Sequence, residues 1–110
     1  MKKLGVLLGV CLFSFALKAQ NQEYCHLQGA VYETSTKQGS DFWVFVEESE
    51  AFADLLVYKE ENKLYADEAG IWFFVESNGL ADFTVFLTKK RIEADFIIYF
   101  TDTSSFAGCK

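Results

Sequence analysis

The chain has 110 residues, of which sixteen are acidic and ten are basic, so its net charge is −6 at pH 7. Three basic residues, Lys2, Lys3 and Lys18, lie in an N-terminal segment that we expect to be removed, leaving a net charge of about −9. Such an acidic domain is not expected to bind nucleic acid, because phosphate contacts require a basic face, nor to bind anionic membranes. The remaining chain is long enough for one small domain.

The N-terminus has the layout of a secretory signal peptide. A charged start is followed by fourteen apolar residues, LGVLLGVCLFSFAL, a stretch too short to span a bilayer comfortably. We expect residues 1–19 to be the signal, with cleavage after Ala16 or Ala19. Residues 20–110 would then form a single repeat domain that is secreted or periplasmic.

An aromatic residue returns six times in the same local setting, at a spacing of thirteen residues with one step of fifteen. This regularity indicates a repeat architecture, in which one short unit cannot bury its apolar face without its neighbours. The longer step reflects a two-residue insertion, Asp67-Glu68. Because the fifth position of every unit is aromatic, we predict that this column forms the buried core: Tyr32, Phe45, Tyr58, Phe73, Phe86 and Tyr99.

Each unit is predicted to contain one strand and one helical turn. A β-branched residue or tryptophan precedes the aromatic one, which favours a strand, and the flanking positions are also apolar, so most strands should be buried on both faces. A polar stretch follows, and the turn ends at alanine in five of the six units. Five units place a good helix N-cap residue before this turn: Thr36, Ser49, Asn62, Ser77 and Thr103.

Four units begin with aspartate, at Asp41, Asp54, Asp82 and Asp95. We interpret each carboxylate as an acceptor for nearby turn amides where the helical turn gives way to the strand. A ladder of calcium ligands is the alternative, but each Asp stands alone between a small residue and a hydrophobe, whereas calcium requires several converging oxygens. No metal or other cofactor is therefore expected.

Two cysteines of the mature chain bracket the repeats. Cys25 lies just before the first unit and Cys109 just after the last. A small domain benefits from a covalent cross-link, and an exported protein folds where disulfides persist. We predict a disulfide between them.

Three segments resemble the septoil knot domain family of bacterial proteins: FADLLVY (52–58), GIWFFVESNGLADFTVF (70–86) and EADFIIYFTDTSSFAG (93–108). The resemblance covers residues 28–108 and implies a compact, repeat-built toroid whose backbone is deeply knotted, with no known activity. Gly39, Ser40 and Cys109 depart from the pattern. The expected fold is thus mainly β with single-turn helices, six to seven repeats closing into a knotted toroid. Without the resemblance a β-solenoid or a meander is favoured, because ordinary connections do not thread loops.

No catalytic motif is evident in the sequence. His26 follows Cys25, but adjacent residues of an extended chain point to opposite sides, and no third group orients the imidazole. Trp43 and Trp72 could stack against a sugar, although their columns are apolar in most units, which favours core packing. We therefore expect an exported, non-catalytic structural or interaction domain. The alternative is an extracellular binding module for a glycan or a peptide of another protein.

Overall fold

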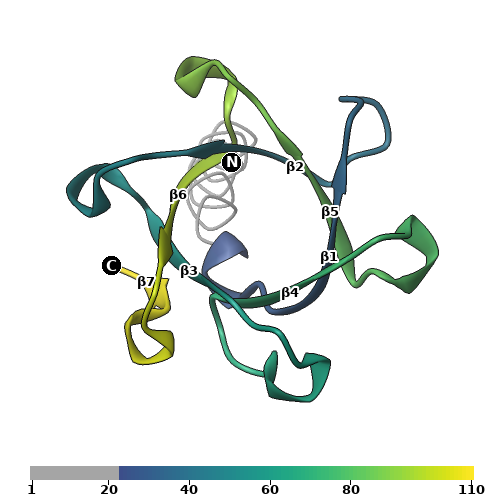
Figure 1. Ribbon diagram of the computed structural model, residues 1–110. Coiled ribbons are helices and arrows are strands. Elements are labelled where there is room, and N and C mark those ends of the chain that lie inside the picture. Colours follow the sequence, from purple (N-terminus) through teal and green to yellow (C-terminus); the bar gives the residue numbers. More distant parts are fainter. Residues whose placement is uncertain (1–22) are drawn as a thin grey trace, which may run out of the picture.

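The computed structural model describes residues 23–110 as a ring of strands from which turns project outward (Figure 1). The expected signal, residues 1–19, lies outside the described residues. Within residues 23–110, no helix is both long and apolar enough to cross a membrane. The strands are β1 (Gly29–Thr34), β2 (Phe42–Val46), β3 (Leu55–Lys59), β4 (Ile71–Val75), β5 (Phe83–Leu87), β6 (Phe96–Thr101) and β7 (Gly108–Cys109). The 3-10 turns are η1 (Glu23–His26), η2 (Glu50–Phe52), η3 (Lys63–Tyr65), η4 (Asn78–Leu80), η5 (Arg91–Glu93) and η6 (Ser104–Phe106).

Six strands form one closed, barrel-like sheet in the order β4-β1-β5-β2-β6-β3, and β3 pairs back with β4. All six run parallel. The chain advances two places around the ring at each step, except from β3 to its neighbour β4. As a result β4, β5 and β6 lie between strands laid down in the first circuit. The mainly β fold with short turns is confirmed, whereas an open solenoid or a meander does not fit a closed parallel sheet.

Neighbouring strands are offset by the same amount around the ring. The second residue of one unit pairs with the fourth residue of the adjacent strand's unit, as Gly29 pairs with Trp72 and Phe42 with Val85. A constant offset in one direction tilts the strands and lets a narrow sheet close on itself.

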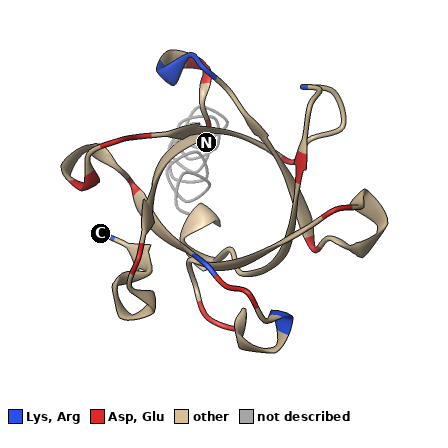
Figure 2. Ribbon diagram, viewed as in Figure 1, with Lys and Arg blue, Asp and Glu red and all other residues tan. Residues whose placement is uncertain are grey.

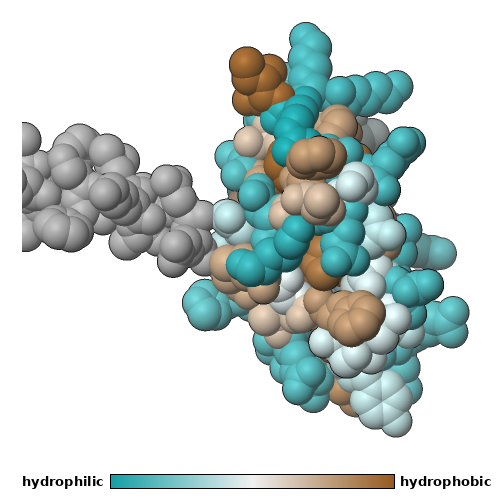
Figure 3. Space-filling view, turned by 90° about the vertical axis from the view of Figure 1, so that its left-hand side faces the viewer, coloured by the Kyte–Doolittle hydropathy of each residue, from teal (hydrophilic) through white to brown (hydrophobic). Residues whose placement is uncertain are grey.

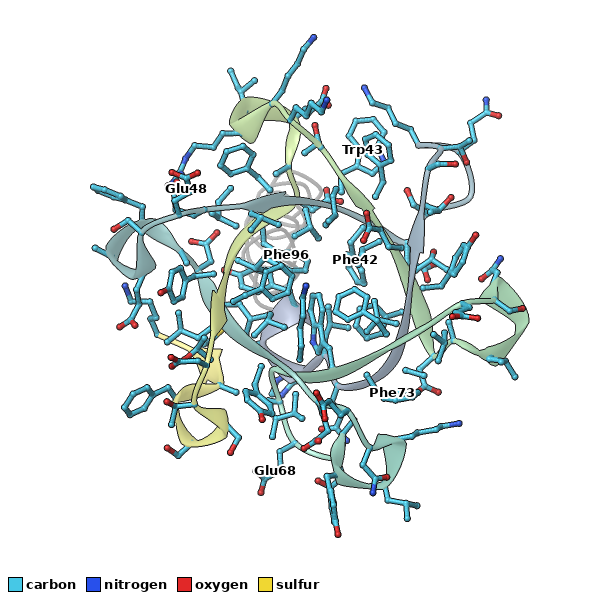
Figure 4. The ribbon with its side chains drawn as sticks, in the orientation of Figure 1. Phe42, Trp43, Glu48, Glu68, Phe73 and Phe96 are labelled. Carbon is cyan, nitrogen blue, oxygen red and sulfur yellow. A yellow bond between two sulfur atoms is a disulfide. The ribbon has the colours of Figure 1, made fainter. Side chains whose placement is uncertain are left out.

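The core lies inside this ring and is formed by alternate residues of each strand. Phe42 and Phe96, at the second position of their units, point into the ring, whereas Trp43 and Phe73 lie outside it (Figure 4). The fourth position is the most completely buried, with no exposed surface on any of its six residues: Val31, Val44, Val57, Trp72, Val85 and Ile98.

The prediction that the aromatic fifth column forms the core is wrong. All six of its residues are half-buried, and none belongs to the interior cluster. Side chains alternate across a strand, so the residue after the inward fourth position must point outward. The outer face is nevertheless partly covered, because η4 packs against β1, η6 against β3 and η2 against β6. This cover explains why β3 and β6 each contain three consecutive buried residues, as expected for strands buried on both faces. β5 has the same pattern because its Thr84 is bonded to Gly39 and Asp41, in the segment before β2.

A single helical turn follows each strand from β2 to β6, as predicted, but the first unit has none after Thr36. The N-cap prediction is wrong for Ser49, Ser77 and Thr103, whose side chains make no capping bond; Asn62 alone accepts, from the Leu64 N–H at 3.0 Å. A three-residue turn is closed by its backbone, since the alanine that ends it donates to the carbonyl three residues earlier.

The four unit-initial aspartates bind a neighbouring strand and not their own turn, which corrects our interpretation. The Asp82 N–H donates to the Ala30 carbonyl at 2.8 Å, and the Ala30 N–H donates back to the Asp82 carboxylate at 2.8 Å. We call this two-way pairing an Asp clamp. The same arrangement joins Asp41 to Thr84, Asp54 to Ile97 and Asp95 to Trp43.

The reassigned core makes a matched pair of predictions. We expect Phe96→Ala to lower the free energy of unfolding by ~3–5 kcal/mol, because this ring is 2% exposed and fills the interior. Phe86→Ala should cost ~1–2 kcal/mol, since its ring lies half-buried on the outer face. Denaturant titration measures both, and equal losses would contradict the inward assignment of the second column.

The Asp clamp predicts a loss of stability that depends on an acceptor oxygen. Asp82→Ala leaves the N–H of the fully buried Ala30 without a partner and should cost ~1–3 kcal/mol. Asp82→Asn keeps an oxygen and should cost less. Asp67→Ala, in the exposed insertion, is the control and should change stability by less than ~0.5 kcal/mol. Equal effects of the two alanine variants in a urea titration would show that the clamp contributes nothing.

Candidate functional site

The two ends of the barrel are chemically different because all six strands run in one direction. We call the end reached by the carboxyl ends of β1 to β6 the open end, and the opposite end the sealed end. The sixth position of each unit is the last one on the inward side before the open end. Its residues are not uniformly apolar: Glu33, Val46, Lys59, Phe74, Leu87 and Phe100.

A hollow of about 580 Å³ lies at the open end. Its apolar lining comes from the outward Phe73 and from Phe74, Leu87 and Phe100. The last three also pack against the interior cluster. Phe74 and Phe100 meet edge to face, with ring centroids 6.2 Å apart. Below them, the buried Trp72 lies 6.1 Å from Phe74, so the rings stand on a rigid base. The hollow is thus a partly aromatic depression supported by the core.

Charged groups surround this aromatic surface. The Lys59 ammonium lies 4.2 Å from the centroid of Phe100 and 5.6 Å from that of Phe74. Three carboxylates, of Glu33, Glu60 and Glu61, also line the hollow, and acidic residues are spread around the whole ring (Figure 2). The Glu60 carboxylate already has a hydrogen-bond donor, because it accepts from the Glu61 N–H at 2.8 Å.

The sealed end is closed by the segment that precedes the first strand. Within η1, the Tyr24 ring stacks on Phe96 with centroids 4.6 Å apart. The Leu27 carbonyl accepts from the Trp72 indole N–H at 3.1 Å and from the Gly70 N–H at 2.9 Å. Burial raises the pKa of Tyr24, and the nearby Asp54 carboxylate raises it further. These contacts hold the N-terminal segment against the amino ends of the strands.

The C-terminus is fastened to the same end. β7 pairs antiparallel with β3 at Leu55 and Leu56, before the residues of β3 that pair with β4. Gly70 fits this crowded place with φ of 83°, because a Cβ there would lie 2.7 Å from the Leu56 carbonyl oxygen. Cys109 is disulfide-bonded to Cys25, as predicted, with the Cα atoms 5.3 Å apart.

A second hollow, of about 420 Å³, lies at the sealed end beside this disulfide. Tyr24 contributes the sole ring of its lining, and the rest comes from Cys25, Ala53, Asp54, Cys109 and Lys110. Two of these residues are held by the disulfide, and Lys110 donates to the Glu50 carbonyl at 2.8 Å. The open end therefore offers the larger and more aromatic surface.

The candidate residues of the sequence analysis do not converge on a reactive site. The Cys25 sulfur is bonded to Cys109, so His26 has no free thiol beside it. Over residues 23–110, no group of three or more His, Cys, Asp or Glu side chains is placed to hold a metal ion. Trp72 is fully buried, as expected of a core residue, and Trp43 lies on the outer face, which corrects its assignment to the core.

Trp43 belongs to a network that fastens neighbouring turns. The Lys37 ammonium lies 4.8 Å from the indole centroid and 3.3 Å from the Glu93 carboxylate. A hydrogen bond from Thr88 lowers the pKa of Glu93, and Lys37 lowers it further. Trp43 thus has a structural role on the outer face and does not line the hollow at the open end.

Sequence reasoning missed the open end because its residues come from several units. A signal was nevertheless present: Glu33 and Lys59 interrupt a column that is otherwise apolar. Charges on an inward position are unfavourable unless that position reaches solvent. Once the sixth column is known to point inward, these two charges indicate that the column lies at an end of the barrel that is open to solvent.

The disulfide predicts a test of how the ends are held. Cys25 and Cys109 are 84 residues apart, and chain-entropy reasoning gives ~4.5 kcal/mol of stabilisation for closing such a loop. Replacing both cysteines with serine should lower the urea midpoint, and a reductant should have no further effect on that variant. Intact-mass analysis of the wild-type domain, purified without reductant, should find no free thiol. Two alkylatable thiols would contradict the cross-link.

The geometry agrees with a comparison to known families. The family model of the 7(1) septoil knot domain matches residues 25–110, a range that includes all seven strands and both disulfide cysteines. No curated protein matches the chain, and no solved structure does. Because the family match spans most of the sequence, the chain belongs to the septoil knot domain family.

Proposed function

We propose that this chain is an exported, non-catalytic interaction domain that binds its ligand at the open end of the barrel. The supporting observation is the difference between the two ends. The sealed end is occupied by the chain's own N-terminal segment, β7 and the disulfide, whereas the open end keeps an aromatic hollow rimmed by charge. Ligand sites commonly occupy the mouths of barrels, in hollows of this size.

Export and the absence of catalysis are parts of the same proposal. A disulfide between the two ends of the domain is compatible with an oxidising compartment, and the N-terminal sequence has the layout of a signal. Removal of residues 1–19 would leave residues 20–110 as the mature domain. Catalysis is disfavoured because the sole histidine stands beside an oxidised cysteine.

We also infer that the backbone is knotted. In support, the chain continues beyond one full circuit of the ring, and its later strands lie between those of the first circuit. Threading of this kind is rare among ordinary folds, but it is the property that gives the family its name. A knotted, disulfide-closed chain would hold the open end in one shape, so little ordering would be required when a ligand binds.

The outer surface is a weaker candidate for binding. Its large exposed apolar residues are distributed over five turns, η2 to η6, which project in different directions (Figure 1): Phe52, Leu64, Tyr65, Leu80, Ile92 and Phe106. On the face shown in Figure 3, hydrophobic residues form small patches among hydrophilic ones. Single exposed hydrophobes are normal on a protein surface. Glycan stacking on the indoles is not favoured either, since Trp72 is buried and Lys37 lies over Trp43.

The experiment is an NMR titration of the mature, oxidised domain with a panel of small ammonium compounds, carboxylates, sugars and short peptides. We expect amide shifts confined to residues around Lys59, Phe74 and Phe100. Leu87→Arg places a long charged side chain in the hollow and should abolish the shifts. Ile92→Arg, a matched change on an exposed turn that does not line the hollow, should leave them intact. Shifts that cluster around Trp43, or a panel that gives none, would contradict the proposal.

A further inference from the structure

We propose that the ligand of the open end is an organic cation, an alkylated or methylated ammonium group on a small apolar body. It would sit on the Phe74–Phe100 pair in the place now taken by the Lys59 ammonium. This inference rests on the proposed binding function of the open end and specifies its ligand class.

The chain itself demonstrates that the aromatic pair holds an ammonium group. The Lys59 nitrogen lies 4.2 Å from the Phe100 centroid, well inside the range of a cation–π contact, and 5.6 Å from Phe74. The two rings meet edge to face and rest on the core through Trp72. A second cation of similar size can use the same rings once the lysine side chain has moved.

The lysine is placed so that it can move. Its side chain is exposed, and within residues 23–110 no carboxylate oxygen lies at ion-pair distance from its nitrogen. The ammonium is therefore held by the rings alone, a contact worth about 0.5–1 kcal/mol at an exposed site. A ligand that offers a cation together with apolar contact area can displace it.

The surrounding charge selects a cation over an anion. Glu33, Glu60 and Glu61 line the hollow, against the single positive charge of Lys59. When Lys59 swings out to solvent, the hollow presents three carboxylates to the entering group. The wall formed by Leu87 and the two rings favours an apolar body over a strongly hydrated inorganic ion. Cation, apolar body and acidic rim together fit an alkylated ammonium compound.

The test compares three probes of nearly equal shape: choline, its neutral carbon isostere 3,3-dimethylbutan-1-ol, and 3,3-dimethylbutanoate. NMR titrations of the mature, oxidised domain would give the affinity of each and the residues that shift. We expect choline to bind at least ~10-fold more tightly than the alcohol, and the carboxylate to bind most weakly. Raising the salt concentration should weaken choline binding.

Two variants assign the contacts. Lys59→Met removes the internal competitor and a like charge, so it should tighten choline binding by about 3–10-fold. Phe100→Leu should weaken it, whereas Phe106→Leu, the same change on an exposed turn, should have no effect. Thermal melts would establish that the Phe100 variant is folded, and Lys59→Met tests the same contact without touching the core.

Each contrary outcome has a distinct meaning. If the alcohol binds at the open end as tightly as choline, the cation inference is wrong but the proposed function stands. If the carboxylate binds best and Lys59→Met abolishes its binding, the open end is an anion site. If none of the probes shifts residues of the open end, the cation inference fails, and the wider panel decides whether the proposed function fails with it.

Discussion

The structure depends on keeping six parallel strands at one constant offset around a closed ring. Antiparallel neighbours can be joined by a short hairpin that sets their pairing, but parallel neighbours cannot. Here the strands that pair come from different circuits of the chain, 43 or 52 residues apart at the Asp clamps. Each clamp uses both the N–H and the carboxylate of one aspartate, so it fits one alignment of the two strands. A slip of one residue would also turn the inward side chains outward.

The constant offset also determines where chemistry can occur. It stacks the second, fourth and sixth positions of the units as successive inward layers, and the common strand direction brings every sixth position to the same end. The first two layers contain apolar side chains and close the interior. The third layer meets solvent, and here the chain places Glu33 and Lys59 beside Phe74 and Phe100. The hollow is thus a consequence of how the ring ends and needs no separate loop or lid.

Local features of this fold could be predicted from the sequence, whereas the pairing of distant segments could not. The strands and five of the six turns follow from patterns within one unit, and the cysteine pairing follows from the position of the two ends. The burial of the aromatic column was mispredicted because a thirteen-residue repeat does not reveal which side of a strand points inward. The partners of the aspartates were missed because Asp82 and Ala30 lie 52 residues apart.

The two strand pairs that lack an Asp clamp explain where the termini are fastened. The unit-initial residues there are Gln28 and Ala69, and both pairs involve β4. β4 follows the Asp67-Glu68 insertion and pairs with β3 over just two residues, which leaves the start of β3 free to take β7. On the other side, the Leu27 carbonyl binds Gly70 and Trp72, so the N-terminal segment supplies the missing contacts. The disulfide then joins the N-terminal segment to β7. Where the repeat is weakest, the ends of the chain take over its role, and the opposite end of the barrel is left open.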